Sequence, residues 1–95
     1  MKIDFTGKTA VVFGASRGIG KGIATVLASA GAKVYVSSRT ESNCKGLKEE
    51  LTAQGYHAEY CAAEVSDYEA VDRVMVKAIE ETGRLNLRIT LPVSQ

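Results

Sequence analysis

Three glycines within seven residues, Gly14, Gly18 and Gly20, separate an apolar segment from a helical pattern. The apolar segment, residues 8–13, contains β-branched side chains and has the composition of a strand buried on both faces. Behind the glycines, apolar residues recur at helical spacing, and Gly31 stands where a helix would end in a left-handed conformation. The sequence therefore predicts a strand, a tight turn and a helix in direct succession.

The same alternation continues along the chain. Further strands are predicted at residues 33–38, 57–62 and 85–91, with a helix at 41–54 between the first two of them. The segment 85–91 alternates apolar with polar residues, which is typical of a half-exposed strand. Strands that alternate with helices favour a parallel sheet with right-handed crossovers, so we expect an α/β fold.

Two helix starts carry capping residues. Thr40 is a candidate N-cap for the helix at 41–54. Ser66 and Glu69 have the spacing of a capping box before the next helix, and Gly83 is expected to end that helix. The same helix has the clearest apolar stripe of the chain, made of Tyr68, Val71, Val74, Met75, Ala78 and Ile79.

Composition excludes several classes of protein. The chain has 95 residues, with 12 Lys and Arg against 11 Asp and Glu, so its net charge is +1. This balance argues against nucleic-acid or membrane-surface binding, which needs a basic excess. Apolar runs reach about five residues, far short of the roughly 20 of a membrane helix. The first residues show no signal or transit pattern, so we expect a single cytoplasmic domain.

The cysteines and the histidine do not suggest a metal site. Cys44 and Cys61 are the only cysteines and His57 is the only histidine, which are too few ligands for zinc. We expect both thiols to be reduced, half-buried structural residues. His57 has no carboxylate, serine or cysteine placed to make it catalytic, so we expect it at the surface or a sheet edge.

The glycine segment has the pattern G-x-x-x-G-x-G between a strand and a helix. Gly14 allows the tight turn, Gly18 lets a phosphate approach the backbone, and Gly20 lets the helix pack close to the strand. Unpaired N–H groups at the helix start favour the negative charge of a pyrophosphate. The context is the one that a dinucleotide-binding motif requires, although a glycine-rich turn without a ligand remains the alternative.

The end of the second strand indicates which dinucleotide is preferred. NAD-binding domains usually place an acidic residue here to bind the ribose hydroxyls, whereas this chain has Ser38 and Arg39. Arg39 can bind a 2′-phosphate through two hydrogen bonds, and Arg17 could contact the same phosphate from the glycine turn. The sequence thus favours NADP(H) over NAD(H), with solvated loop arginines as the alternative.

Taken in order, these motifs resemble the N-terminal part of the short-chain dehydrogenase/reductases, most of all the NADPH-dependent carbonyl reductases and 3-oxoacyl-[acyl-carrier-protein] reductases. The resemblance extends to about residue 85 and rests on the stretches 7–12, 14–20, 31–34, 37–39 and 64–67. It implies a three-layer, Rossmann-like, doubly wound parallel sheet of order 3-2-1-4 with helices on both faces. It further implies that residues 16–19 bind the phosphates, that Ser38 and Arg39 select NADP, and that Glu64 and Val65 border the adenine. The predicted cofactor-binding residues are Gly14, Ser16, Arg17, Gly18, Ile19, Gly20, Ser37, Ser38, Arg39, Glu64 and Val65.

Three departures from the family pattern bear on function. Phe13 replaces a frequent threonine, and Glu64 replaces the usual aspartate. Residues 86–95 lack the Asn-Asn-Ala-Gly that ends the family's fourth strand. The family's catalytic serine and Tyr-x-x-x-Lys pair are also absent, because none of the four tyrosines is followed by lysine four positions later. Without that pair, the family's tyrosine general acid has no counterpart here.

These observations leave three hypotheses open. The chain, residues 1–95, is a single partial dinucleotide-binding domain of a truncated oxidoreductase, with a divergent tail at 86–95, and is not catalytic alone. Alternatively, it is a reductase completed by dimerisation or a second chain, or a non-enzymatic interaction module. An exposed fourth strand is expected to favour self-association or a protein partner. Neither the substrate nor the origin of the short chain follows from the sequence.

Overall fold

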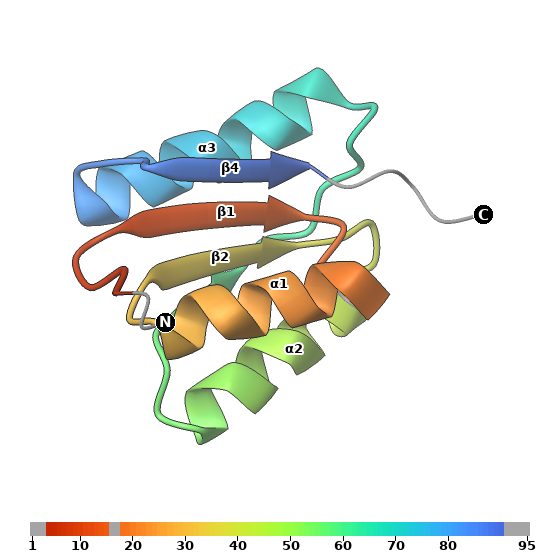
Figure 1. Ribbon diagram of the computed structural model, residues 1–95. Helices are drawn as coiled ribbons and strands as arrows, with labels where there is room; N and C mark the ends of the chain where they lie inside the picture. Colours follow the sequence, from red (N-terminus) through yellow and green to blue (C-terminus); the bar gives the residue numbers. More distant parts are fainter. Residues whose placement is uncertain (1–3, 16–17, 91–95) are drawn as a thin grey trace.

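The computed structural model describes residues 4–15 and 18–90. Strands and helices alternate as expected, and Figure 1 shows their arrangement. The third strand is shorter than expected, because only three residues pair with their neighbour. The elements in chain order are β1 (Thr9–Phe13), α1 (Gly18–Ser29), β2 (Lys33–Ser37), α2 (Glu41–Ala53), β3 (Ala58–Tyr60), α3 (Tyr68–Thr82) and β4 (Leu87–Thr90).

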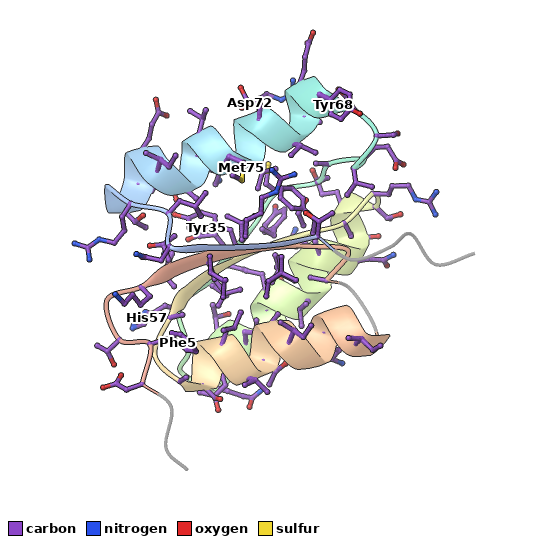
Figure 2. All side chains as sticks on the ribbon, turned by 45° about the horizontal axis from the view of Figure 1, so that its top comes forward. Phe5, Tyr35, His57, Tyr68, Asp72 and Met75 are labelled. Carbon is purple, nitrogen blue, oxygen red and sulfur yellow. The ribbon has the colours of Figure 1, made fainter. Side chains whose placement is uncertain are left out.

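The four strands form one parallel sheet in the order β3-β2-β1-β4, which confirms the predicted order. β1 lies between β2 and β4, and Ala10 is paired with Val34 on one side and with Leu87 on the other. Helices α1 and α2 cover one face of the sheet and α3 covers the other, as Figure 2 shows. Because all strand pairs are parallel, the carboxyl ends of the four strands lie at one edge of the sheet.

The alternating side chains of β1 fill two separate core clusters. Val12 packs with the residues of α1 and α2, whereas Val11 and Phe13 pack under α3. All five residues of β1 are buried, because both faces are covered and both strand edges are paired. The prediction of a doubly buried first strand is confirmed, and each buried valine contributes about 1.5–3 kcal/mol.

Strand β4 forms one edge of the sheet. Asn86 precedes it and makes two hydrogen bonds with Thr9, each 2.9 Å long. The backbone N–H of Asn86 donates to the Thr9 carbonyl oxygen, and the backbone N–H of Thr9 donates to the Asn86 Oδ1. Three of the four residues of β4 are exposed, and Ile89 is half-buried against the α1 and α2 cluster. The expected half-exposed strand is therefore present, but fewer of its residues are buried than its alternating sequence predicts.

The start of α3 differs from the expected capping box. Asp67, and not Ser66, is the N-cap, and its Oδ1 accepts a hydrogen bond from the Ala70 N–H at 3.2 Å. Both residue types cap helices well, so the sequence alone could not choose between two adjacent candidates. Thr40 is the N-cap of α2 as predicted, but its side chain makes no capping hydrogen bond. Gly83 ends α3 in the left-handed conformation, which confirms its predicted role.

The apolar stripe of α3 is only partly buried. Tyr68 is 84% exposed and Ile79 is 45% exposed, so these two members of the predicted stripe do not lie in the core. Successive helix residues are turned by about 100°, so these two side chains lie about a quarter turn or more from the centre of the buried face. Only one helix covers this side of the sheet, and nothing in the described part packs on its outer flank. The buried residues of α3 are Ala70, Val71, Val74 and Ala78.

The two cysteines and the histidine lie at positions that do not form a metal site in the described residues. Cys44 is fully buried in α2, and its Sγ donates to the Glu41 carbonyl oxygen at 3.4 Å. Cys61 is half-buried and also free, and His57 is exposed beside the start of β3. Within residues 4–15 and 18–90, no group of three or more metal-ligating side chains is placed to hold an ion.

Candidate cofactor site

The loops that follow β1, β2 and β3 are tied together at the carboxyl edge of the sheet. The N–H groups of Gly14 and Ala15 both donate to the Ser37 carbonyl oxygen, at 2.8 and 3.1 Å. The Ala63 N–H donates to the Ser38 carbonyl oxygen at 2.9 Å. These bonds fasten the glycine turn to the end of β2 and the end of β2 to the loop after β3. Ligands of open α/β sheets bind at this edge.

The glycine turn has the backbone geometry that its sequence predicts. Gly14 and Gly18 have φ values of +78° and +62°, which residues with a Cβ rarely adopt. A Cβ built on Gly18 would meet no atom within 4 Å, so the space above this backbone is open to a ligand. Gly20 is buried in the first turn of α1, as expected for a residue that lets the helix pack closely. Ser16 and Arg17 lie outside the described residues.

The first turn of α1 is suited to an anion. The first N–H groups of a helix have no intrahelical acceptor, and the helix dipole places partial positive charge there. No acidic residue occupies the first turn of α1, so no carboxylate competes for these groups. Ile19, also predicted to contact the cofactor, is 76% exposed at this turn. These features fit a pyrophosphate group.

The three residues at the end of β2 have different surroundings. Ser37 is fully buried, and its Oγ has no hydrogen-bond partner among the residues the structure describes. Its carbonyl oxygen, which anchors the glycine turn, is therefore its main contribution to the site. Ser38 is 7% exposed, and its Oγ donates to the Thr40 carbonyl oxygen at 2.8 Å. Arg39 is exposed at the rim of the site.

Glu64 and Val65 follow β3 and lie beside the end of β2. Val65 is half-buried against the cluster under α3. The Glu64 Oε2 atom lies 3.7 Å from the Arg39 Nε atom. Sequence reasoning missed this ion pair, because it assigned Arg39 to the 2′-phosphate and Glu64 to the adenine. The sequence could have predicted the ion pair, because the two residues carry opposite charges and follow strands that were expected to be adjacent and parallel.

A separate cavity lies at the opposite edge of the sheet. It has a volume of about 240 Å³ and is lined by residues near the starts of β1 and β4, among them Thr9 and Leu87. Its lining includes none of the predicted cofactor-binding residues. The candidate cofactor site is therefore an open edge of the sheet and not this cavity.

Comparison with known sequences identifies the family. The family model described as short chain dehydrogenase matches residues 8–90. The chain belongs to the short chain dehydrogenase family. The predicted resemblance is thus confirmed, and the described Rossmann-like sheet agrees with it.

The matches to similar proteins cover nearly all of this chain. Glycine betaine reductase ATRR of Emericella nidulans is 39% identical over 88 residues, which is 93% of this chain and 7% of that protein. The structure of a hydroxysteroid dehydrogenase from Escherichia coli has a TM-score of 0.88 and 29% identity over 92% of this chain and 37% of its own. A metagenomic short-chain oxidoreductase, solved in complex with NADP, has a TM-score of 0.82 and 33% identity over 93% and 39%.

The chain is short compared with these family members. It spans 7% of the first relative and about a third of several others, including 32% of the oxidoreductase UcpA from Salmonella typhimurium. It corresponds to a fragment of the longer short chain dehydrogenases. In the part of the chain that the structure describes, no helix combines the length and apolar character needed to cross a membrane.

Proposed function

We propose that this chain binds NADP(H) where β1, β2 and β3 end, as the nucleotide-binding portion of a short chain dehydrogenase. The observation that carries the proposal is Gly18, a left-handed residue at the start of α1 with open space where a Cβ would stand. A phosphate can approach the backbone there and meet the free N–H groups of the first helical turn. The NADP complex of a structural neighbour supports the same cofactor.

In this proposal the pyrophosphate and the adenosine half of the cofactor have residues assigned to them. Residues 14–20 hold the pyrophosphate through backbone N–H groups, and Ile19 covers it. Arg39 binds the 2′-phosphate through its guanidinium group, with Ser38 shaping the loop beneath it. Glu64 and Val65 border the adenine. Bound NADPH supplies a hydride, whereas this chain supplies the binding and orientation of the adenosine half.

The chain is not expected to reduce a substrate by itself. No tyrosine of the sequence precedes a lysine by four positions. Tyr35 is fully buried, and burial raises the pKa of its hydroxyl well above the ordinary value, with a further contribution from its hydrogen bond to Glu81. A general acid of this family needs the opposite shift. Tyr35 is therefore a structural hydrogen-bond donor.

The direct test is a calorimetric titration of the chain with NADPH and with NADH. We expect NADPH to bind more tightly, because only its 2′-phosphate engages Arg39. Arg39→Asp should weaken NADPH binding about tenfold or more, since a hydrogen bond to a charged group contributes about 1.5–3 kcal/mol. NADH binding should change little. Arg73→Asp, an exposed residue of α3 away from the site, is the charge-matched control.

Two results would contradict the proposal. Equal affinity for the two dinucleotides would remove the role of Arg39. Absence of binding to either would favour a non-enzymatic interaction module, for which the exposed β4 edge is the supporting feature. Turnover of a carbonyl substrate with NADPH would instead support a reductase completed by a second copy or another chain.

A further inference from the structure

The ion pair between Arg39 and Glu64 lies inside the proposed cofactor site. The Arg39 Nε and Glu64 Oε2 atoms are 3.7 Å apart, and the two side chains are 62% and 38% exposed. The cationic group assigned to the 2′-phosphate therefore already has an anionic neighbour from the protein itself. Neither the length of the pair nor its exposure suggests a large contribution to folding stability.

The backbone holds these two residues next to each other. Arg39 follows Ser38 and Glu64 follows Ala63, and the Ala63 N–H donates to the Ser38 carbonyl oxygen at 2.9 Å. The Glu64 carbonyl oxygen also accepts a hydrogen bond from the Asp67 N–H at 2.8 Å, in the turn before α3. Main-chain hydrogen bonds thus hold the two residues next to each other, whether or not their side chains form the ion pair.

We infer that Glu64 weakens the preference for NADP(H) over NAD(H) by competing with the 2′-phosphate for Arg39. This inference rests on the proposed NADP(H) function and assigns Glu64 a second effect, besides its place at the adenine. A carboxylate beside Arg39 lowers the affinity for a dinucleotide with a 2′-phosphate and leaves the affinity for one without it nearly unchanged. Glu64 therefore makes the difference in affinity between NADP(H) and NAD(H), which Arg39 creates, smaller.

Two physical effects act in the same direction. A phosphate that binds Arg39 through two hydrogen bonds either displaces the Glu64 carboxylate from the guanidinium group or binds close to this carboxylate. A phosphate carries a charge of about −1.5 to −2 at neutral pH, so the carboxylate repels it. A ribose hydroxyl at the same position is uncharged and is not repelled. The difference between the two ligands therefore reports the effect of Glu64.

The test uses ligands that contain only the adenosine half of the cofactor, because this chain has no residues assigned to the nicotinamide half. Adenosine 2′,5′-bisphosphate and adenosine 5′-monophosphate are titrated into the full chain and into Glu64→Gln. We expect Glu64→Gln to bind the bisphosphate roughly two- to fivefold more tightly, the range for release of an exposed ion pair. The affinity for the monophosphate should change by less than the bisphosphate affinity.

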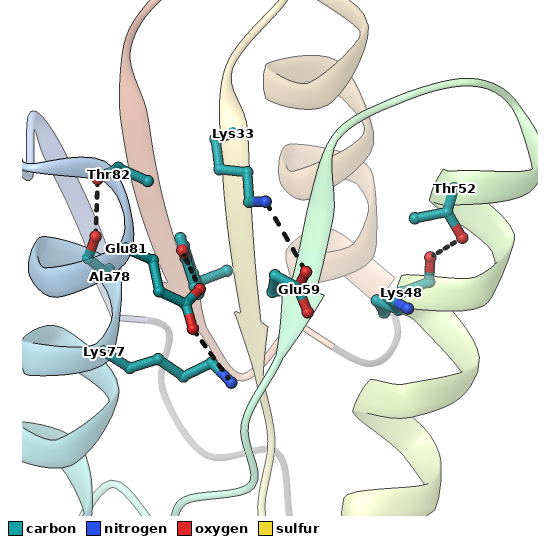
Figure 3. Close-up of polar contacts among 9 residues, drawn as sticks. Lys33, Lys48, Thr52, Glu59, Lys77, Ala78, Glu81 and Thr82 are labelled. Atoms are coloured by element: carbon teal, nitrogen blue, oxygen red, sulfur yellow. Dashed lines mark hydrogen bonds and ion pairs between the residues drawn. The ribbon is translucent and has the colours of Figure 1, made fainter.

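The chain offers a closely matched control in Glu59. Its Oε2 lies 3.8 Å from the Lys33 Nζ, and its side chain is 37% exposed, nearly as for Glu64. Figure 3 shows this pair between β2 and the edge strand β3, and in the sheet Glu59 is paired with Tyr35, in the middle of β2 and not at its carboxyl end. Glu59→Gln makes the same change in net charge and should leave both affinities unaltered.

Each outcome decides between the inference and the proposed function. If wild type prefers the bisphosphate and Glu64→Gln leaves that preference unchanged, the inference is wrong and the proposed function stands. An equal gain for both ligands, or an equal gain in Glu59→Gln, also overturns it, because the effect would not depend on Arg39 and the phosphate. If wild type binds neither ligand, both the inference and the proposed function fail.

Discussion

At the scale of single residues, the site depends on backbone conformations that only glycine adopts easily. Gly18 combines a φ of +62° with open space at its α-carbon. These two properties have separable consequences. The positive φ affects stability, whereas the open space affects only a ligand that enters it.

Gly18→Ala should affect both stability and ligand binding, and the two effects can be measured separately. The left-handed conformation costs a non-glycine residue roughly 1–2 kcal/mol, so the free energy of unfolding should fall by about that amount. NADPH affinity should fall as well, because the new methyl group stands where the phosphate approaches. Urea denaturation measures the first effect and calorimetric titration the second.

Gly55→Ala is the matched control for this substitution. Gly55 has a φ of +87° and likewise no atom within 4 Å of a built Cβ. It precedes β3, however, and so lies at the amino ends of the strands, opposite the proposed cofactor site. It should lose similar stability and keep wild-type affinity for NADPH. A comparable loss of affinity in Gly55→Ala would show that general destabilisation, and not phosphate approach, is responsible.

At the scale of elements, Tyr35 and Glu81 join β2 to α3 through one short hydrogen bond. The Tyr35 hydroxyl donates to the Glu81 Oε1 at 2.6 Å, and Glu81 is also 3.8 Å from Lys77 in the preceding turn (Figure 3). Burial raises the pKa of Tyr35, and the hydrogen bond to Glu81 raises it further. The neutral hydroxyl is therefore the form that the folded state stabilises.

This shift predicts a loss of stability in alkaline solution. The unfolded tyrosine ionises at about pH 10, whereas the folded one does so only at higher pH. The stabilisation is fully present below pH 10 and is lost as the pH rises above it. Urea denaturation at pH 8 and pH 11 should show a larger decrease for wild type than for Tyr35→Phe. Equal decreases would mean that Tyr35 is not the group responsible.

The corrected cap of α3 can be tested in the same way. Asp67→Ala removes the acceptor of the Ala70 N–H and should lower the free energy of unfolding by about 1 kcal/mol. Ser66→Ala removes a side chain with no capping bond in this structure and should have little effect. Thermal and urea melts of both variants measure the difference. A larger loss in Ser66→Ala would restore the capping box predicted from the sequence.

At the scale of the whole molecule, the sheet has an exposed edge and α3 has an exposed apolar flank. Among the described residues β4 pairs with β1 alone, and its Leu87 is 37% exposed. Edge strands with free N–H and C=O groups favour pairing with another chain. We therefore predict that the protein self-associates through β4.

Sedimentation velocity over a range of concentrations tests this prediction. Wild type should shift to larger species as concentration rises, and Leu87→Lys should shift less, since a charged edge opposes strand pairing. Val26→Lys, at an exposed position of α1, adds the same charge away from β4 and is the control. A wild-type monomer at every concentration would refute self-association.

Much of this architecture was predictable because it depends on short-range patterns. Gly14, Gly18 and Gly83 lie at turns whose conformations only a few residue types adopt, so their positions marked element boundaries correctly. The sheet order followed from the resemblance, and the handedness of strand–helix–strand units is consistent with it. The cytoplasmic location, the reduced state of the thiols and the cofactor contacts remain predictions.

The sequence by itself determined the succession of elements, the glycine turn and the family. Only the tertiary structure decided which side chains of these elements meet. Arg39 and Glu64 are 25 positions apart, and they form a pair because β2 and β3 are neighbours. Ser37 is buried and Tyr68 exposed for a similar reason, because burial depends on which element covers a face. Such contacts join distant parts of the chain, so no local pattern encodes them.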